Sequence, residues 1–518
     1  MARCASTRRP KLVLIPMSAH HHAPATRLRV LVDAPPRSKG SGARHVLHWM
    51  TSYRRTHHNF ALQHAVARAA ELDLPLLVFE PLRAGYPHAS DRHHAFVIEG
   101  MRDTARRCAE AGVAYLPWIE SEPGAGKGLL ARLAKDAALV VTDDWPGFFV
   151  PRMLAAAART LDTRLEAVDS TGLCPQSEMT RDFARAFDFR RHLQKVLAPH
   201  LSQVPRADAL QGADSLPSLG AVAAPRGFAS PTDDILGRGR AALRQLPIDH
   251  AVPPVDAVGG EVEGRRRAMD FVRSRLPRYG EERSEPTSDA SSGLSPWIHY
   301  GQLSSHELLA LVARQENWTV ASMSGRANGS KDGWWGLGAS AEAFMDELVT
   351  WRELGVAYNL LHGERHDYEA LPEWARRTLD EHAVDRREHV YALEELEAAR
   401  THDPLWNAAQ RQLLSEGVIH NYLRMLWGKK VVEWTASPRE ALRILIHLNN
   451  RWAIDGRDPN SLSGIYWCLG RYDRPWAPRR EVFGTIRWMS SENTARKFKV
   501  KPYLAKHASS SVQGSLWS

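Results

Sequence analysis

The chain has 518 residues, enough for two or three domains, and its 25% charged and 43% hydrophobic residues exclude a disordered or fibrous protein. Lys and Arg outnumber Asp and Glu by 68 to 59, a formal net charge of +9 that fits a polyanionic partner but also an ordinary solvated surface. No apolar run is long enough to span a membrane. The cysteines (Cys4, Cys108, Cys174, Cys468) form no CxxC pair, so we expect a cytoplasmic protein without a structural metal.

Residues 1–42 are predicted to form a flexible, basic lead-in. They contain Arg8 and Arg9 and a Pro-, Gly- and Ser-rich run, and no acidic residue precedes Asp33. The three consecutive histidines at positions 20–22 lack neighbouring ligands, so we do not interpret them as a metal site.

Residues 43–202 predict a Rossmann-like α/β domain, because short apolar runs alternate with helical patterns. The expected strands are His45–Met50, Pro75–Glu80, Val113–Ile119, Ala138–Asp143 and Leu165–Asp169. The expected helices are Asn59–Leu72, Arg92–Ala111, Gly126–Ala137 and Val150–Leu161. No GxGxxG follows the first strand, which argues against an ordinary dinucleotide site.

The segment Gly124-Ala-Gly-Lys127-Gly128 has some features of a phosphate-binding loop. That motif needs a glycine five residues before Gly126 and a Ser or Thr after the lysine, whereas Ser121 and Gly128 occupy these positions. We therefore reject a phosphate loop here.

Residues 203–260 are rich in Ala, Pro, Gly and Ser and predict an interdomain linker, followed by an all-α domain over 261–505 and a tail over 506–518. Tryptophan, with 17 residues, outnumbers both phenylalanine and tyrosine, and most of the tryptophans follow residue 290. This concentration favours stacking on planar ligands or electron transfer, although packing is the ordinary role of any single tryptophan.

A turn rich in hydroxyl groups, Ser291-Ser-Gly-Leu-Ser295-Pro296, precedes one of the predicted helices. Ser295 suits the N-cap and Pro296 the first helical position. Such a turn can present backbone N–H groups to a phosphate, although a plain capped helix has the same sequence pattern.

The helical half resembles the photolyase and cryptochrome family, and specifically the class II cyclobutane pyrimidine dimer photolyases. The matching segments include Tyr279-x3-Arg283-x2-Pro286, Leu294-Ser-Pro-Trp-Ile-His-Tyr-Gly-Gln302, Glu347-Leu-Val-Thr-Trp-Arg-Glu-Leu354, Thr401-His-Asp-Pro-Leu-Trp-Asn407, His420-Asn-Tyr-Leu-Arg-Met-Leu-Trp-Gly-Lys-Lys430, Asp455-Gly-Arg-Asp-Pro-Asn460 and Val482-Phe-Gly-Thr-Ile-Arg487. The match is firm over 200 residues and looser in the N-terminal half.

The resemblance implies an α/β domain followed by an all-α FAD-binding domain, and light-driven repair of pyrimidine dimers in DNA by electron transfer from reduced, noncovalently bound FAD. The expected partner is DNA containing such dimers, the expected cofactor is FAD, and the protein is expected to be a monomer. The residues that match cofactor contacts are Tyr279, Ser291, Ser292, Gly293, Leu294, Ser295, Arg424, Asn449 and Asp455.

The same resemblance assigns Glu347 and Asn449 to catalysis, the first at the dimer and the second at the flavin. Trp351, Met425 and Trp467 match the dimer pocket. Trp476 and Arg487 match residues that enter the space left by the flipped dimer, and the tryptophans matching an electron-transfer chain are Trp406, Trp427 and Trp434.

The sequence departs from this family at several places. The segment from Trp467 to Trp476 is one residue shorter than expected, and Ser461 and Leu462 replace the usual Gly-Tyr. The N-terminal half matches too loosely to predict an antenna chromophore. Two alternatives to a repair enzyme stay open: a cryptochrome-like light sensor that binds flavin without repair, and a flavin-binding helical protein without photochemistry.

Overall fold

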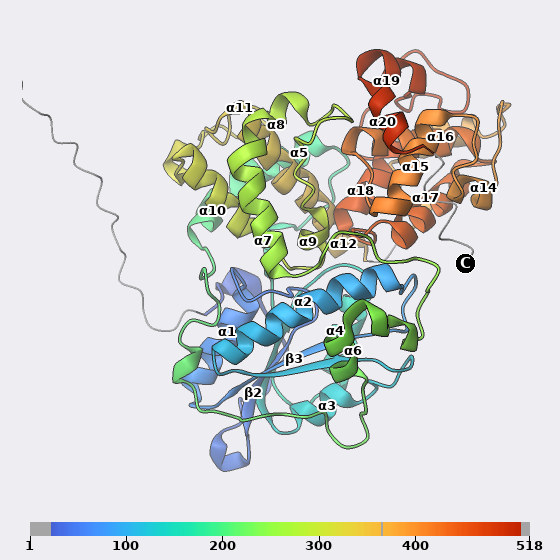
Figure 1. Cartoon of the computed structure of the whole chain (residues 1–518). Coiled ribbons are helices and arrows are strands. Elements are labelled where there is room, and N and C mark those ends of the chain that lie inside the picture. Colours follow the sequence, from blue (N-terminus) through green and yellow to red (C-terminus); the bar gives the residue numbers. More distant parts are fainter. Residues whose placement is uncertain (1–21, 364–365, 509–518) are drawn as a thin grey trace, which may run out of the picture.

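The computed structural model describes residues 22–363 and 366–508, which form a sheet-containing domain below a helical region (Figure 1). The sheet has the strand order β1-β6-β5-β2-β3-β4, in which β1 is antiparallel to β6 and the other neighbours are parallel. The strands are β1 (Leu28–Val32), β2 (His45–Trp49), β3 (Leu76–Leu82), β4 (Ala114–Ile119), β5 (Ala137–Asp143) and β6 (Leu165–Val168). The five predicted strands and their parallel arrangement are confirmed.

Strand β1 corrects the predicted flexible lead-in, because residues 28–32 pair with β6 at the sheet edge. The sequence signal is weak because this edge strand is short and partly exposed. The buried Arg27 just before it pairs with Asp169 at 3.3 Å, which fixes the start of the strand to the end of β6. His22 Nε2 donates to the Glu71 carboxylate at 2.7 Å, and the rest of the histidine triplet lies outside the described residues.

Helices cover both faces of the sheet at the positions that the sequence predicts. They are α1 (Phe60–Glu71), α2 (Asp91–Glu110), α3 (Leu129–Ala134) and α4 (Val150–Thr160). Helix α2 runs between the sheet and the helical region (Figure 1). Its buried Arg92 donates to the carbonyl oxygen of Leu414 at 2.6 Å and to that of Leu413 at 3.2 Å, which joins the two domains.

The predicted linker is folded rather than extended. It contains α6 (Thr232–Arg238) and a 3-10 helix over Gly239–Gln245, and both pack against α2. Ile235 and Leu243 are buried in the core that α2 shares with the helical domain. Apolar residues among the Ala, Gly and Pro of this segment therefore attach the linker to α2.

The helical domain contains no strand among its described residues, which confirms the predicted all-α architecture. Its helices are α5 (Ala186–Val196, contributed from before the linker), α7 (Glu261–Asp270), α8 (Leu276–Glu282), α9 (Ser295–His299), α10 (Ser305–Glu316), α11 (Ala339–Met345), α12 (Arg352–His362), α13 (Glu373–Glu381), α14 (Leu393–Glu397), α15 (Pro404–Glu416), α16 (Asn421–Trp434), α17 (Pro438–Trp452), α18 (Pro459–Cys468), α19 (Ser491–Lys497) and α20 (Val500–Lys506). No helix in the described ranges is long and apolar enough to cross a membrane.

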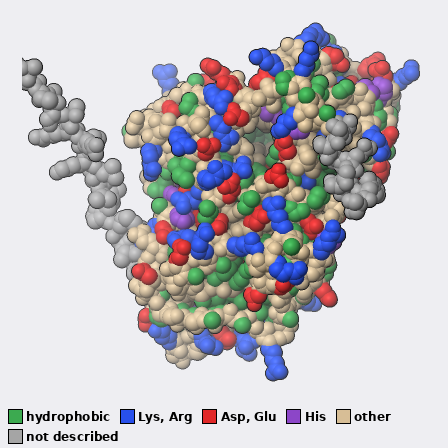
Figure 2. Space-filling model, viewed as in Figure 1, with side chains coloured by type: hydrophobic (Ala, Val, Ile, Leu, Met, Phe, Trp, Pro, Cys, Tyr) green, Lys and Arg blue, Asp and Glu red, His purple; other side chains and the backbone are tan. Residues whose placement is uncertain are grey.

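The face of the molecule seen in Figure 2 shows no continuous basic block. On this face, Lys and Arg side chains are interspersed with Asp and Glu, and hydrophobic side chains line a hollow in the sheet-containing half. Local clusters of charge therefore decide what this face can bind.

Asp458 anchors helix α18 to the rest of the helical domain. Its carboxylate accepts from the backbone N–H of Asn460 at 2.9 Å, which caps the helix, and pairs with the buried Arg352 at 3.2 Å. His299 Nδ1 lies 3.1 Å from the same carboxylate oxygen. Although burial opposes ionisation, the Arg352 charge and the hydrogen bonds to the carboxylate lower the pKa of Asp458 below its ordinary value.

We expect Asp458→Ala to lower the free energy of unfolding at pH 7 by about 3–5 kcal/mol, because Arg352 then stays buried without its partner. Because the pKa of Asp458 is lowered, its contribution is present above the ordinary aspartate pKa of about 3.9 and is lost as the pH falls below it. Thermal unfolding followed by circular dichroism at pH 7 and at lower pH measures both effects.

The matched control is Asp234→Ala, which removes an exposed carboxylate paired with Arg238 on α6. Its melting temperature should equal that of the unchanged protein. Equal losses in the two variants, or a loss at Asp458 that does not shrink in acid, would contradict the anchoring role.

Candidate functional site

Glu347 lies in a π-helical turn over Asp346–Trp351 between α11 and α12, a local irregularity common at functional sites. Arg283, from the C-terminal end of α8, donates to the Glu347 carboxylate at 2.5 Å and also lies over the ring of Tyr279. Burial raises the pKa of Glu347, and the Arg283 charge opposes that rise. The structure therefore brings Glu347 and Tyr279 together through an arginine.

The walls of the predicted dimer pocket come from three elements. Trp351 ends the π-helical turn, Trp467 is on α18 and Met425 is on α16, and all three side chains are half-buried. Trp351 and Trp467 pack against the same core cluster, while Met425 and Trp467 pack against a second one. Trp467 thus lies where the two halves of the helical domain meet.

Arg424 and Asp455 pair at 3.3 Å, between α16 and the loop that follows α17. Asp455 is buried, Arg424 is partly exposed, and no other side chain among the described residues accepts a hydrogen bond from this guanidinium. Its remaining donors are therefore available to an anionic ligand beside the pair.

Asn449, on α17, is buried and donates its amide N–H to the Ser461 hydroxyl at 2.7 Å and to Asn450 at 3.1 Å. Both donors are thereby used, while no described residue donates to the carbonyl oxygen of this amide. Ser461 is one of the residues that depart from the family pattern, and here it orients the Asn449 side chain.

The turn from Ser291 to Ser295 is open. Gly293 has φ +65°, no atom lies within 4 Å of a Cβ built on it, and Ser295 is exposed. None of the described residues forms a hydrogen bond with the three serine hydroxyls of this turn. The predicted N-cap is corrected: Ser295 is the first residue of α9, Leu294 is the N-cap, and no side chain caps the helix.

Trp406 lies between the other two tryptophans of the predicted electron-transfer chain. Its ring is parallel to that of Trp427, with centroids 6.4 Å apart, and its centroid is 5.8 Å from that of Trp434. The Trp406 indole N–H donates to the Trp427 carbonyl oxygen at 3.0 Å. All three are buried, and Trp434 contacts the half-buried Tyr391 near the surface.

Trp476 and Arg487, predicted to enter the DNA duplex, meet each other and the pocket wall. The Arg487 guanidinium lies 4.0 Å from the ring centroid of Trp476 and 5.4 Å from that of Trp467. Both side chains are partly exposed, and they follow α18 in a loop that packs on α13. The two residues are therefore adjacent to the predicted dimer pocket.

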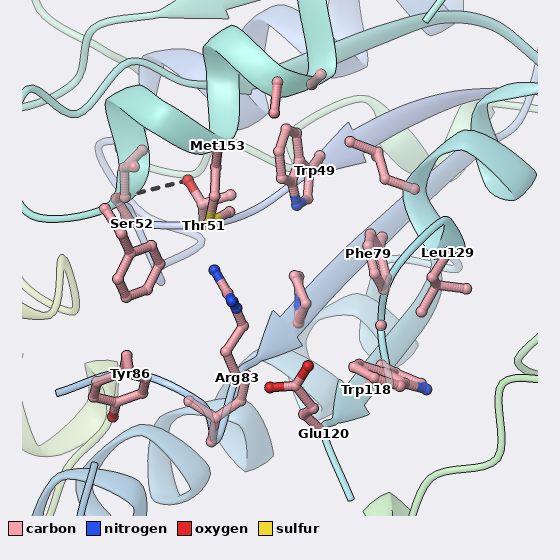
Figure 3. A pocket seen from close by; sticks show the side chains of 18 of the residues that line it. Trp49, Thr51, Ser52, Phe79, Arg83, Tyr86, Trp118, Glu120, Leu129 and Met153 are labelled. Atoms are coloured by element: carbon pink, nitrogen blue, oxygen red, sulfur yellow. Dashed lines mark hydrogen bonds between the residues drawn. The ribbon is translucent and has the colours of Figure 1, made fainter. Parts of the chain in front are cut away.

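A cavity of about 790 Å³ opens in the sheet-containing domain, where sequence reasoning placed no site. Figure 3 shows Trp49, Phe79 and Trp118 along one side of it and Arg83 reaching toward its centre. The Trp49 indole N–H is buried without a partner among the described residues. An unpaired donor in an aromatic cavity suits a planar ligand that carries an acceptor.

The rim of this cavity includes the rejected phosphate-loop segment. Gly124, Gly126 and Lys127 line it, and Lys127 is exposed. Glu120 in the wall accepts from the backbone N–H groups of Ala84 and Gly124, both at 2.9 Å, so its carboxylate is already paired. Among the basic side chains of the cavity, Arg54 pairs with Glu80, whereas Arg83 and Lys127 have no ion-pair partner among the described residues and could meet a charged ligand.

Comparison with known proteins identifies the family. A model of the DNA photolyase family matches residues 46–208. The deoxyribodipyrimidine photo-lyase of Methanothermobacter thermautotrophicus is 34% identical over 485 residues, which cover 93% of this chain and 97% of that protein. The chain belongs to the photolyase and cryptochrome family.

Solved photolyase and cryptochrome structures share the fold. A class III photolyase from Agrobacterium tumefaciens superposes with a TM-score of 0.64 at 16% identity, covering 90% of this chain and 86% of that one. The cryptochrome of Synechocystis sp. PCC6803 gives 0.61 at 16% identity, covering 90% and 89%. Both confirm the predicted α/β domain followed by a helical domain.

Three residues that contact the predicted site residues were not singled out from the sequence. Arg283 holds Glu347, Asp473 holds Trp476 and Arg487, and the fully buried Lys429 lies 4.7 Å from the centroid of Trp467. Arg283 lies in a segment that resembles the family, Tyr279-x3-Arg283-x2-Pro286, and this was the available signal. For Lys429 and Asp473, only the three-dimensional contacts show their positions.

Proposed function

We propose that this protein repairs cyclobutane pyrimidine dimers in DNA by a light-driven reaction, with reduced FAD bound noncovalently in the helical domain, as a class II enzyme. The observation that carries the proposal is the convergence on α16. Arg424 pairs with Asp455, and the next residue, Met425, packs against the same core cluster as Trp467. A cofactor site and an aromatic pocket therefore share one helix.

The residues present fit FAD. Free hydroxyls and an open glycine at Ser291–Ser295 suit its phosphates, and the spare donors of Arg424 suit the negative charge of the reduced isoalloxazine. Asn449, whose N–H groups are already donated, would offer its carbonyl oxygen to a protonated flavin nitrogen. Reduced FAD supplies the excited-state electron, and Tyr279 would complete its surroundings.

The pocket between Trp351 and Trp467 would take the flipped dimer, whose two bases present flat apolar faces and polar edges. Glu347 would contact the base edge, and Arg283 keeps its carboxyl group in place at 2.5 Å. A carboxyl group oriented in advance can stabilise the radical anion of the dimer without reorganising. Unpaired, distorted bases flip at least cost, which favours damaged DNA.

Anaerobic illumination of the chemically reduced, FAD-loaded protein with a dimer-containing duplex should deplete dimers, as measured by chromatography of the digested DNA. Glu347→Gln should bind FAD and DNA nearly normally but repair at least several times fewer dimers per absorbed photon. Glu281→Gln, on α8, is the matched surface control. Flavin photochemistry without any loss of dimers would favour the light-sensor alternative and overturn the repair proposal.

We infer further that an electron passes from Trp434, beside the half-buried Tyr391, through Trp406 to Trp427, and from there to photoexcited, oxidised FAD. The order follows from the ring contacts, because Trp406 touches both of the others, which are seven residues apart on α16. A rise of about 10.5 Å over seven helical residues makes the intermediate ring the natural relay. This chain would restore reduced FAD and would take no part in dimer splitting.

Trp406→Phe should slow photoreduction of oxidised FAD by about tenfold or more, measured by flash absorption, because it removes the relay between two more distant rings. Repair by chemically reduced protein should stay normal. The control is Trp452→Phe, a buried tryptophan of α17 outside the chain. If Trp406→Phe impairs repair and photoreduction equally, the separation of the two routes is wrong.

The cavity in the sheet-containing domain supports the proposal that a second, antenna chromophore binds there. The sequence left the presence of such a chromophore open. Its aromatic walls suit a planar ring, and the unpartnered Trp49 N–H suits a ring acceptor. Arg83 and Lys127 supply positive charge for an anionic tail. Tyr300 and Arg457 line it from the helical domain, so a ligand there would lie against the domain proposed to hold FAD.

FMN is a suitable probe of this cavity in protein already loaded with FAD. We expect it to bind more tightly than riboflavin, which lacks the phosphate, and Lys127→Gln should remove that difference, as measured by fluorescence anisotropy. Lys331→Gln, an exposed lysine of the helical domain, should have no effect. Failure of FMN to bind, or a preference that survives Lys127→Gln, would contradict this ligand class.

A further inference from the structure

Asp473 connects the two side chains that are proposed to enter the DNA duplex. Its carboxylate accepts from the Trp476 indole N–H at 3.1 Å and from two nitrogens of Arg487, Nε at 3.0 Å and Nη2 at 3.3 Å. The Asp473 side chain is 8% exposed, against 39% for Arg487. A nearly buried anion therefore holds the inner ends of two groups whose outer faces meet solvent.

The backbone brings these residues together across the loop. The backbone N–H of Trp476 donates to the carbonyl oxygen of Thr485 at 2.9 Å, so the segment after α18 lies beside the segment that carries Arg487. The guanidinium then stacks on Trp476 at 4.0 Å and reaches the pocket wall, Trp467, at 5.4 Å. Asp473 is the only described carboxylate within ion-pairing distance of Arg487.

Such a triad fixes side chains that would otherwise sample many rotamers. Arginine has a long, flexible stem, and ordering it at the moment of binding costs free energy that ordering it beforehand avoids. A bidentate carboxylate–guanidinium contact also fixes the plane of the guanidinium. The free protein thus already presents Trp476 and Arg487 as one stacked unit.

We propose that Asp473 is a positioning residue for damaged duplex DNA, which holds Trp476 and Arg487 in the stacked arrangement that fills the space left by the flipped dimer. The proposal rests on the proposed repair function. It adds to that function a carboxylate outside the dimer pocket, which prepares the insertion of Trp476 and Arg487 into the duplex. Asp473 then matters for duplex DNA and little for single strands, where no opposite strand leaves a space to fill.

The test compares binding of a dimer in a duplex with binding of the same dimer in a single strand, in the dark, with FAD-loaded protein. Asp473→Ala should weaken duplex binding by about tenfold and single-strand binding by less than about twofold. Arg474→Ala is the control, because the guanidinium of this exposed arginine lies 4.5 Å from the ring centroid of Trp476 but forms no ion pair with Asp473. Its effect should be equal on both substrates.

Asp473→Asn provides a second variant, because it keeps an acceptor for Trp476 and loses the charge that pairs with Arg487. We expect it to weaken binding of the duplex by less than Asp473→Ala does, and to leave single-strand binding unchanged. FAD content and circular dichroism report whether each variant folds. Equal losses on both substrates, or no loss in either folded variant, would overturn the proposal while leaving the repair function intact. If the unchanged protein itself does not prefer dimer-containing DNA, the proposed function fails, and this proposal fails with it.

Discussion

The burial of helix α16 is the constraint on which the rest of the helical domain depends. It packs against α15, α17 and α18, and its buried residues occur on all sides, including Lys429 and Lys430. Lys429 donates to the carbonyl oxygen of Cys468 at 2.8 Å, at the C-terminal end of α18, and burial lowers its pKa to about 8. A buried amine paired in this way is costly to move, so α16 and α18 keep one relative position.

Because α16 is fixed, side chains a few residues apart on it can serve different chemistries without interfering. Arg424 pairs with Asp455. Met425 lies close to Gly464 on α18, the helix that also carries Trp467. Trp427 stacks on Trp406 in the other direction, toward α15. Residues on one helix thus serve two proposed electron transfers on different sides: the transfer from reduced FAD to the dimer, and the transfer along the tryptophans to oxidised FAD.

Much of the architecture could be predicted from the sequence, because strong apolar periodicity specifies the parallel strands and most helices. Strand β1 was missed, since a short edge strand among arginines carries little such signal, and Arg27 and Asp169 that anchor it are far apart in the sequence. The predicted cap at Ser295 failed because the helix starts there without any side-chain cap.

The site was predictable to the extent that its residues lie in continuous motifs. The sequence places Glu347 and Arg283 in separate motifs and cannot show that they pair. It also cannot show that Trp406 lies between Trp427 and Trp434, because the order depends on how α15 packs on α16. The cavity under Trp49 is formed by loops and walls from both domains, which no local pattern encodes.

We propose above all that the helical domain binds FAD where α16, α17 and the loop before α18 meet. A crystal structure of the protein saturated with FAD tests this most directly. We expect flavin density in contact with Arg424, Asp455 and Asn449, with the phosphates near Ser291–Ser295. Flavin found only in the cavity lined by Trp49, or away from all three of those side chains, would contradict it.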